Sequence, residues 1–228
     1  MKKAVVLLSG GLDSATTLYY AKSKGYKCGC LIFDYGQRHK REIKSAKSIV
    51  KKANCKWQLV KITLPWKASS LLDKRMKLPT MDYRLPTTIP STYVPARNII
   101  FLSFALSYAE AIGAKAIFIG ANAIDYSGYP DCRPEFFRAF RDVIKTGTKI
   151  GTQDERRRIQ VKVEAPLINK SKKEIVKLAK RLRVPLGLTW SCYRGGRKPC
   201  GVCDSCVLRA KGFKGAEIKD PLYAGENS

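Results

Sequence analysis

The chain has 228 residues, with 44 Lys and Arg against 18 Asp and Glu, a formal net charge of +26 and a single histidine. The length suits one globular domain with a small appendage, the 45% apolar composition excludes a disordered or fibrous chain, and no apolar run approaches the roughly 18 residues of a membrane span. We expect a cytoplasmic protein without a signal peptide, and one histidine excludes mechanisms that require several, such as three-histidine zinc hydrolysis.

Buried strands and amphipathic helices alternate in the first sixty residues. Short continuous apolar runs are typical of parallel strands, and helical spacing of apolar residues marks the segments between them. We predict strands at 4–8, 28–34 and 58–63, and helices at 14–24 and about 38–52, the first of which is ended by Gly25. This order is typical of a doubly wound α/β domain.

Prolines at 65, 79, 86, 90 and 95 exclude a long regular element in the next thirty residues, so we predict a large excursion from the sheet there. Regular patterns then return. They predict helices at 97–112, 135–145 and 172–183 and strands at 116–120 and 160–165, with a loop at 122–133. Gly113 ends the first of these helices, and Ser171 and Glu174 form a capping box at the last.

These elements predict a three-layer, Rossmann-like α/β domain with a mostly parallel sheet over residues 1–185. A small cysteine-rich, metal-binding segment, residues 186–228, would pack on the same domain. Eight cysteines in a chain without a secretory signal argue against a disulfide framework.

Ser9-Gly10-Gly11-Leu12-Asp13-Ser14 lies between the first strand and the first helix. The glycines permit tight backbone geometry, and the free N–H groups of the helix start point toward an incoming anion. The motif therefore predicts a pyrophosphate cradle, with Asp13 holding Mg²⁺ against phosphate oxygens. A plain strand-to-helix turn is the alternative. Neither GxxxxGK[ST] nor GxGxxG is present.

Cys192, Cys200, Cys203 and Cys206 have the spacing C-x7-C-x2-C-x2-C. Four thiolates can close a tetrahedral zinc site and leave no open coordination position, so we predict a structural Zn²⁺. An iron–sulfur cluster and free or redox-active cysteines are the alternatives.

The SGGxDS motif resembles that of the PP-loop ATP pyrophosphatases, which have the adenine nucleotide alpha hydrolase-like fold and cleave ATP between the α and β phosphates. Three further segments resemble one family within them: DYGQRH at 34–39, VPARN at 94–98, and the Gly-, Asp- and Tyr-rich stretch at 120–133. Together with the four-cysteine tail they are similar to QueC, the 7-cyano-7-deazaguanine (preQ0) synthases. The resemblance runs from about residue 4 to Phe213.

This resemblance implies an ATP-dependent carbon–nitrogen ligase of queuosine or archaeosine biosynthesis. Its substrates would be 7-carboxy-7-deazaguanine and ammonia, and the acid would be adenylated, converted to the amide, adenylated again and dehydrated to the nitrile. A homodimer that does not require nucleic acid is implied. The ATP-binding segment would be Leu8, Ser9, Gly10, Gly11, Leu12, Asp13, Ser14, Ala15, Thr16, Thr17 and Leu18.

Candidate catalytic residues are Asp13, Ser14, Arg97 and Asp131, and candidate substrate contacts are Arg38, Asp125, Tyr126, Tyr129 and Asp131. A carboxylate suits the N–H donors of a deazaguanine, a tyrosine can stack on its ring, and a guanidinium can bind a carboxylate or triphosphate. Turn formation and ordinary packing are the alternatives. His39 is the one imidazole base, and Cys132 is a possible nucleophile or a packed thiol.

Two rival functions remain open. A PP-loop enzyme acting directly on tRNA would use the +26 charge, although such enzymes usually carry additional RNA-binding domains. A zinc-ribbon nucleic-acid binder would explain the charge and the cysteines but not SGGLDS. Because Lys and Arg are scattered along the chain, we favour a solvated basic surface.

Overall fold

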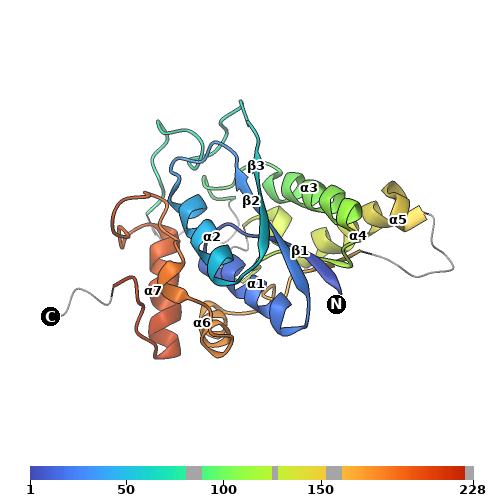
Figure 1. Cartoon of the computed structure of the whole chain (residues 1–228). Coiled ribbons are helices and arrows are strands. Elements are labelled where there is room, and N and C mark those ends of the chain that lie inside the picture. The colour runs from blue at the N-terminus through green and yellow to red at the C-terminus, as the bar shows by residue number, and fades with distance from the viewer. Residues whose placement is uncertain (81–88, 125–127, 153–160, 224–228) are drawn as a thin grey trace.

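The computed structural model describes residues 1–80, 89–124, 128–152 and 161–223. Five parallel strands form one sheet in the order β3-β2-β1-β4-β5 (Figure 1). The strands are β1 (Lys3–Leu7), β2 (Lys27–Asp34), β3 (Lys56–Lys61), β4 (Ala116–Phe118) and β5 (Lys162–Glu164). The helices are α1 (Leu12–Ser23), α2 (Arg41–Lys52), α3 (Arg97–Ile112), α4 (Pro134–Gly147), α5 (Lys149–Thr152), α6 (Lys172–Arg181) and α7 (Asp204–Ala216), with short 3-10 turns at Pro130–Cys132 and Leu186–Leu188.

Helices cover both faces of the sheet, so the predicted three-layer α/β architecture is confirmed (Figure 1). Alternate side chains of β1 enter different cores, because successive residues of a strand point to opposite faces. Ala4 and Val6 join the cluster that includes α1, α2, α6 and α7, whereas Val5 and Leu7 join the cluster that includes α3 and α4. No helix among the described residues is long and apolar enough to cross a membrane.

The five predicted strands are present, although β3 begins two residues before the predicted start. Sequence analysis missed α7. Its buried positions include Ser205, Arg209 and Gly212 beside Phe213 and Ala216, so the apolar period that marks a helix is interrupted by polar residues and glycine. Phe213 and Ala216 nevertheless join the same buried cluster as the sheet.

The strand order reverses direction at β1, whose neighbours are β2 on one side and β4 on the other. In open α/β sheets, ligands bind outside the carboxyl ends of the strands at such a switch point. The loops after β1 and β4 meet there: a Cβ atom on Gly120 would lie only 2.9 Å from the backbone nitrogen of Ser14. The segment that begins at Ser9 therefore lies at the switch point of the sheet.

Candidate active site

The loop between β1 and α1 depends on glycine at position 10. Gly10 has a φ of +89°, and a Cβ atom there would lie 2.3 Å from the carbonyl oxygen of Glu42 and 2.7 Å from the backbone nitrogen of Ala46. The first turns of α2 therefore pack directly against this loop. Only glycine has both the allowed conformation and the space for this contact.

Two serine hydroxyls close the loop over the start of α1. The Oγ atoms of Ser9 and Ser14 lie 3.0 Å apart, and the Ser9 N–H donates to Ser14 Oγ over 3.2 Å. Because the first N–H groups of a helix have no partner within it, this end of α1 presents several donors to an anion. Of the predicted ATP-binding segment, Ala15, Thr16, Thr17 and Leu18 are buried inside α1 and hold the helix in place.

Asp13 has a partner that sequence reasoning missed. Nζ of Lys172, the first residue of α6, lies 2.8 Å and 3.1 Å from the two carboxylate oxygens of Asp13. Gly212 of α7 makes room for the lysine stem, since a Cβ atom there would lie 2.4 Å from Lys172 Cγ. A carboxylate offers about four lone-pair positions, so this ion pair leaves acceptors on Asp13 for a magnesium ion.

Beside the loop lies a cavity of about 240 Å³, lined partly by aromatic side chains. Phe33 and Phe101 stack with their ring centroids 3.9 Å apart, and Tyr35 meets the edge of Phe101. Tyr129, a predicted substrate contact, also lines the cavity, and its hydroxyl lies 2.6 Å from Thr92 Oγ1. Flat apolar surfaces with a few polar groups are suited to a planar heterocycle.

Two opposite charges, Arg97 and Glu42, face this cavity. Burial opposes the positive charge of Arg97, but Tyr35, Tyr129 and Asp131 around the guanidinium raise its pKa above the usual range. Burial, together with the nearby Cys192, raises the pKa of Glu42 to about 7, although Arg97 opposes this shift. The predicted Arg97 thus lies in the cavity as a permanent cation, whereas Glu42 was missed because an acidic residue in the first turn of a helix is commonplace.

Asp131 is not among the described residues that line the cavity. Its Oδ2 atom accepts the Asn98 N–H over 3.1 Å at the start of α3, and the side chain is 4% exposed. In this position the Asp131 carboxylate stabilises the helix end that carries Arg97, and its expected contact with the substrate stays a prediction. Burial and Asp131 raise the pKa of the neighbouring Cys132 thiol to about 12, so Cys132 is a packed thiol at neutral pH.

The other predicted groups lie elsewhere. The Arg38 guanidinium donates to the Lys74 carbonyl over 2.6 Å and is outside the cavity lining described, so its expected substrate contact stays a prediction. His39 packs against Gly195 of the cysteine-rich segment and likewise does not reach the lining described. Asp125 and Tyr126 lie outside the described residues.

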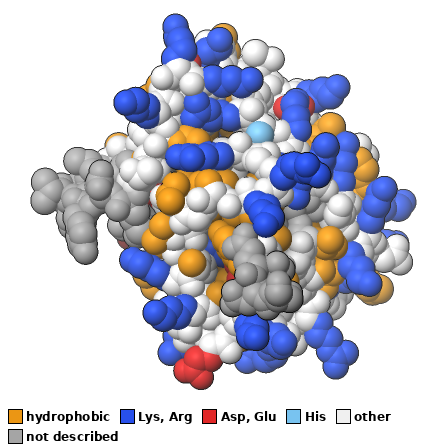
Figure 2. All heavy atoms as spheres, turned by 90° about the vertical axis from the view of Figure 1, so that its left-hand side faces the viewer, with side chains coloured by type: hydrophobic (Ala, Val, Ile, Leu, Met, Phe, Trp, Pro, Cys, Tyr) orange, Lys and Arg blue, Asp and Glu red, His pale blue; other side chains and the backbone are white. Residues whose placement is uncertain are grey.

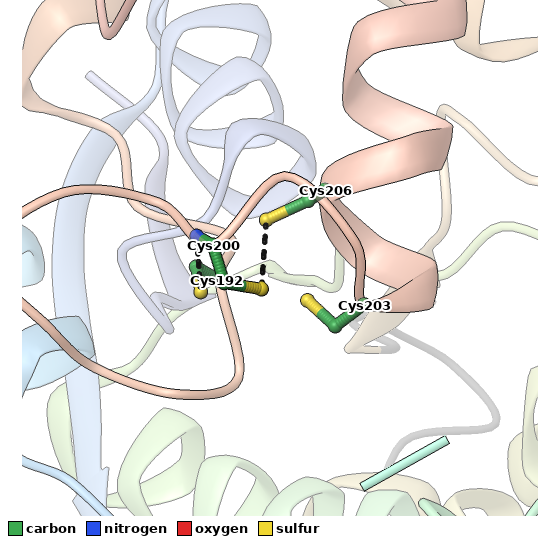
Figure 3. A group of neighbouring side chains, drawn as sticks. All are labelled: Cys192, Cys200, Cys203 and Cys206. Atoms are coloured by element: carbon green, nitrogen blue, oxygen red, sulfur yellow. Dashed lines mark hydrogen bonds between the residues drawn. The ribbon is translucent and has the colours of Figure 1, made fainter. Parts of the chain in front are cut away.

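The four cysteines of the C-terminal segment come together as the spacing predicts (Figure 3). Their sulfur atoms all lie within 4.8 Å of one another, and three of the residues are buried. The Cys200 N–H donates to Cys192 Sγ over 3.3 Å, which favours a thiolate at that sulfur. Four converging thiols without a disulfide are the donor set of a closed zinc site.

This cysteine cluster is joined to the loop between β1 and α1 through Trp190. The Trp190 N–H donates to the Gly10 carbonyl over 2.9 Å, and its indole N–H donates to the Cys192 carbonyl over 2.9 Å. The guanidinium of Arg41, at the start of α2, lies 4.5 Å from the Trp190 ring centroid. One residue therefore connects the cysteine cluster, the loop between β1 and α1, and α2.

Figure 2 shows the face of the molecule that includes α2 and α7. Lys and Arg side chains are spread over this face with hydrophobic side chains between them, and few acidic side chains appear. The charges do not form one dense patch in this view. Such a surface raises the local concentration of anions without specifying one partner.

The model of a family described as queuosine biosynthesis protein QueC matches residues 3–217. A curated 7-cyano-7-deazaguanine synthase of Acetivibrio thermocellus is 56% identical over 223 residues, covering 97% of each chain. Another from Thermoplasma volcanium is 52% identical over 222 residues, covering 97% of this chain and 90% of the relative.

Among solved structures, a 4-thiouridine synthetase in complex with RNA and bound ATP has a TM-score of 0.51 and 18% identity. The match covers 95% of this chain and 53% of that one, and it supports the fold alone. The family match spans residues 3–217, and the two curated relatives are 56% and 52% identical over 97% of the chain. The chain therefore belongs to the QueC family, whose curated members similar to it are named 7-cyano-7-deazaguanine synthases.

Proposed function

We propose that this protein is an ATP-dependent ligase that converts 7-carboxy-7-deazaguanine and ammonia into 7-cyano-7-deazaguanine in the cytoplasm, for queuosine or archaeosine biosynthesis. The observation that carries the proposal is the convergence of an anion-binding loop, the cation of Arg97 and an aromatic wall on one cavity at the sheet switch point. The names of the curated relatives support the proposed product, 7-cyano-7-deazaguanine.

We call the loop between β1 and α1 the phosphate loop and propose that it binds ATP. The N–H groups at the start of α1 and the hydroxyls of Ser9 and Ser14 would hold phosphate oxygens. Asp13 would hold Mg²⁺, which supplies charge neutralisation on the triphosphate. Lys172 would add a second positive charge at the same place, since its Nζ already lies beside Asp13.

The cavity is proposed to bind the acid. Phe33, Phe101, Tyr35 and Tyr129 would enclose the planar ring, and Arg97 would orient the carboxylate toward the α-phosphate. Adenylation is required because an oxide ion is too poor a leaving group for direct exchange with nitrogen. The same argument applies to the amide, whose oxygen must also leave, so one cavity would serve both rounds.

Residues 186–228 are proposed to form a zinc-binding part of the same domain. All four ligands are cysteines, so a bound Zn²⁺ would supply structural rigidity and no open catalytic position. The contacts of Trp190 would transmit that rigidity to Gly10. An iron–sulfur cluster remains the alternative for the same donor set.

We also propose a homodimer that uses α3. Ile99 and Phe104 are 43% and 42% exposed on this helix, and its 16 residues contain only two charged side chains, Arg97 and Glu110. Two copies of a chain with a net charge of +26 repel each other, and this repulsion is weakest where the contacting surfaces carry few Lys and Arg side chains. Exposed apolar patches of this kind commonly mark interfaces.

The test is to incubate the purified protein with ATP, magnesium, ammonium and 7-carboxy-7-deazaguanine and to follow products by mass spectrometry. The proposal predicts the nitrile, with the amide as an intermediate and AMP and pyrophosphate as coproducts. AMP formed only after addition of tRNA, with the acid unchanged, would instead assign the protein to direct tRNA modification. Salt-dependent tRNA binding without ATP binding would favour the nucleic-acid binder.

A further inference from the structure

The proposed reaction requires a proton acceptor at the substrate nitrogen. Ammonia carries three N–H bonds and the nitrile carries none, so every one of these protons must leave the nitrogen during the two rounds. Adenylation supplies a leaving group for oxygen but removes no proton from nitrogen. A basic group within reach of the reacting carbon is therefore part of the chemistry.

Among the described residues that line the cavity, the carboxylates are Asp13 and Glu42. Asp13 is bound through both oxygens to Lys172 and lies where phosphate and magnesium are proposed to bind. His39 packs on the cysteine-rich segment instead. Burial raises the pKa values of Cys132 and of Tyr35, so neither is a good proton acceptor at neutral pH.

Glu42 remains, and its position suits the task. Its own carbonyl oxygen lies against Gly10, which fixes the first turn of α2 beside the phosphate loop. Its carboxylate shares the cavity with Arg97, the group proposed to orient the substrate carboxylate, and the positive charge of Arg97 acts on it. Glu42 thus lines the same cavity as the loop proposed to bind ATP and as Arg97.

We propose that Glu42 is the catalytic base that takes protons from the substrate nitrogen in amide and nitrile formation. This inference rests on the proposed function. When ammonia attacks the adenylated acid, the C–N bond forms, AMP leaves with the C–O bond electrons, and Glu42 takes one N–H proton. After the amide oxygen attacks the α-phosphate and pyrophosphate leaves, loss of one N–H proton gives the imidate. Loss of the last N–H proton forms the C≡N bond and expels AMP.

Between these steps the protonated carboxyl returns its proton to water. Burial raises the pKa of Glu42 to about 7, and a base that titrates near the working pH can both accept and release protons. Asp13, Arg97, Tyr35 and Lys172 are the other titratable groups that line the cavity around it, together with Tyr129, Tyr193, Cys132 and Arg209. Cys192 of the cysteine cluster also acts on Glu42 and raises its pKa, so the position of Glu42 in the cavity, and not this pKa, carries the proposal.

The experiment compares Glu42→Gln with the wild-type protein in two assays. The first is acid-dependent exchange between ATP and pyrophosphate without ammonium, which reports adenylation alone. The second is conversion of the amide to the nitrile, which requires proton removal from nitrogen. Glu135→Gln is the matched control, because Glu135 is 68% exposed and lies outside the cavity.

We expect Glu42→Gln to retain exchange and to lose nitrile formation by about 100-fold or more, the usual effect of removing a general base, so that the amide accumulates. Glu42→Ala with added formate should recover part of the nitrile-forming rate, since formate can occupy the space of the carboxylate. Normal nitrile formation by Glu42→Gln would overturn the inference. So would equal loss of both reactions, or a raised KM for the acid with an unchanged kcat, which would indicate binding. Absence of nitrile from the wild-type protein would instead contradict the proposed function.

Discussion

Lys172 and Asp13 are 159 positions apart in the sequence, yet Nζ of the lysine lies 2.8 Å from Oδ2 of the aspartate. The lysine side chain is 9% exposed and the aspartate side chain 19%. A cation held this firmly beside the start of α1 requires little reorganisation when phosphate arrives, which is the arrangement that stabilises developing negative charge most effectively. The pair therefore connects α6 to the proposed adenylation step.

Replacing Lys172 with Met should reduce adenylation. Loss of one preorganised cation next to the phosphates is expected to lower acid-dependent ATP–pyrophosphate exchange by about 100-fold. Lys173→Met is the matched control, because the neighbouring lysine is exposed and should leave exchange unchanged. Equal exchange rates for the two variants would show that Lys172 serves only to pair Asp13.

Replacing Gly10 with Ala should destabilise the loop through two separable effects. The φ of +89° is unfavourable for alanine, and the new Cβ would overlap the Glu42 carbonyl oxygen. Gly25→Ala isolates the first effect, since Gly25 has a φ of +79° and a Cβ atom there would meet nothing within 4 Å. We expect Gly10→Ala to lose more free energy of unfolding in urea than Gly25→Ala and also to bind ATP more weakly. Similar losses would indicate that α2 yields to the methyl group.

The features that could be predicted from the sequence are those whose partners are close along the chain. Gly10 and Gly11 directly precede α1, and Ser14 lies in its first turn. The short C-x2-C spacings bring Cys200, Cys203 and Cys206 together with little dependence on the fold. Apolar runs such as 4–8 identify buried strands because both faces of a parallel sheet are covered.

The contacts that could not be predicted depend on tertiary packing. Lys172 reaches Asp13 only because α6 packs against α1 and Gly212 leaves room for the lysine stem. Glu42 enters the cavity only because α2 packs against Gly10. Asp131 has the right chemistry to bind a deazaguanine, but its Oδ2 atom accepts the N–H of Asn98, which is 33 positions away in the sequence. A single sequence does not distinguish these outcomes.

Removing the proposed metal should weaken ATP binding as well as stability. Cys206→Ser is expected to lose bound zinc, to lower the Tm and to raise the Kd for ATP, because Trp190 links the cysteine cluster to the Gly10 carbonyl. Metal content by elemental analysis and ATP titration by calorimetry test this. Cys55→Ser, outside the cluster, should keep its zinc. Unchanged ATP affinity after metal loss would show that ATP binding does not depend on the cysteine cluster. Bound iron in place of zinc would favour an iron–sulfur cluster.

Alkylation by iodoacetamide near pH 8 should distinguish the cysteines outside the metal centre. A hydrogen bond from Cys30 and the nearby Lys22 lower the pKa of Cys55 below the usual value of a thiol, although burial opposes this shift, so thiolate forms more readily at this half-buried residue. Burial raises the pKa of Cys28 and of Cys132 to about 12, and both remain protonated. Because the thiolate is the reactive form, peptide mapping should find Cys55 modified first. Rapid modification of Cys132 would restore it as a candidate nucleophile.

Introducing a charge on the exposed face of α3 should separate the proposed dimer. Phe104→Glu places a carboxylate on the exposed side of α3, where burial against a second copy would leave it unpaired, so dissociation is favoured. Sedimentation equilibrium should change from dimer mass for the wild-type protein to monomer mass for the variant. Val143→Glu is the control, because Val143 is 53% exposed on α4 and adds the same charge outside α3. A wild-type monomer, or a Phe104→Glu variant that stays dimeric, would exclude α3 as the interface.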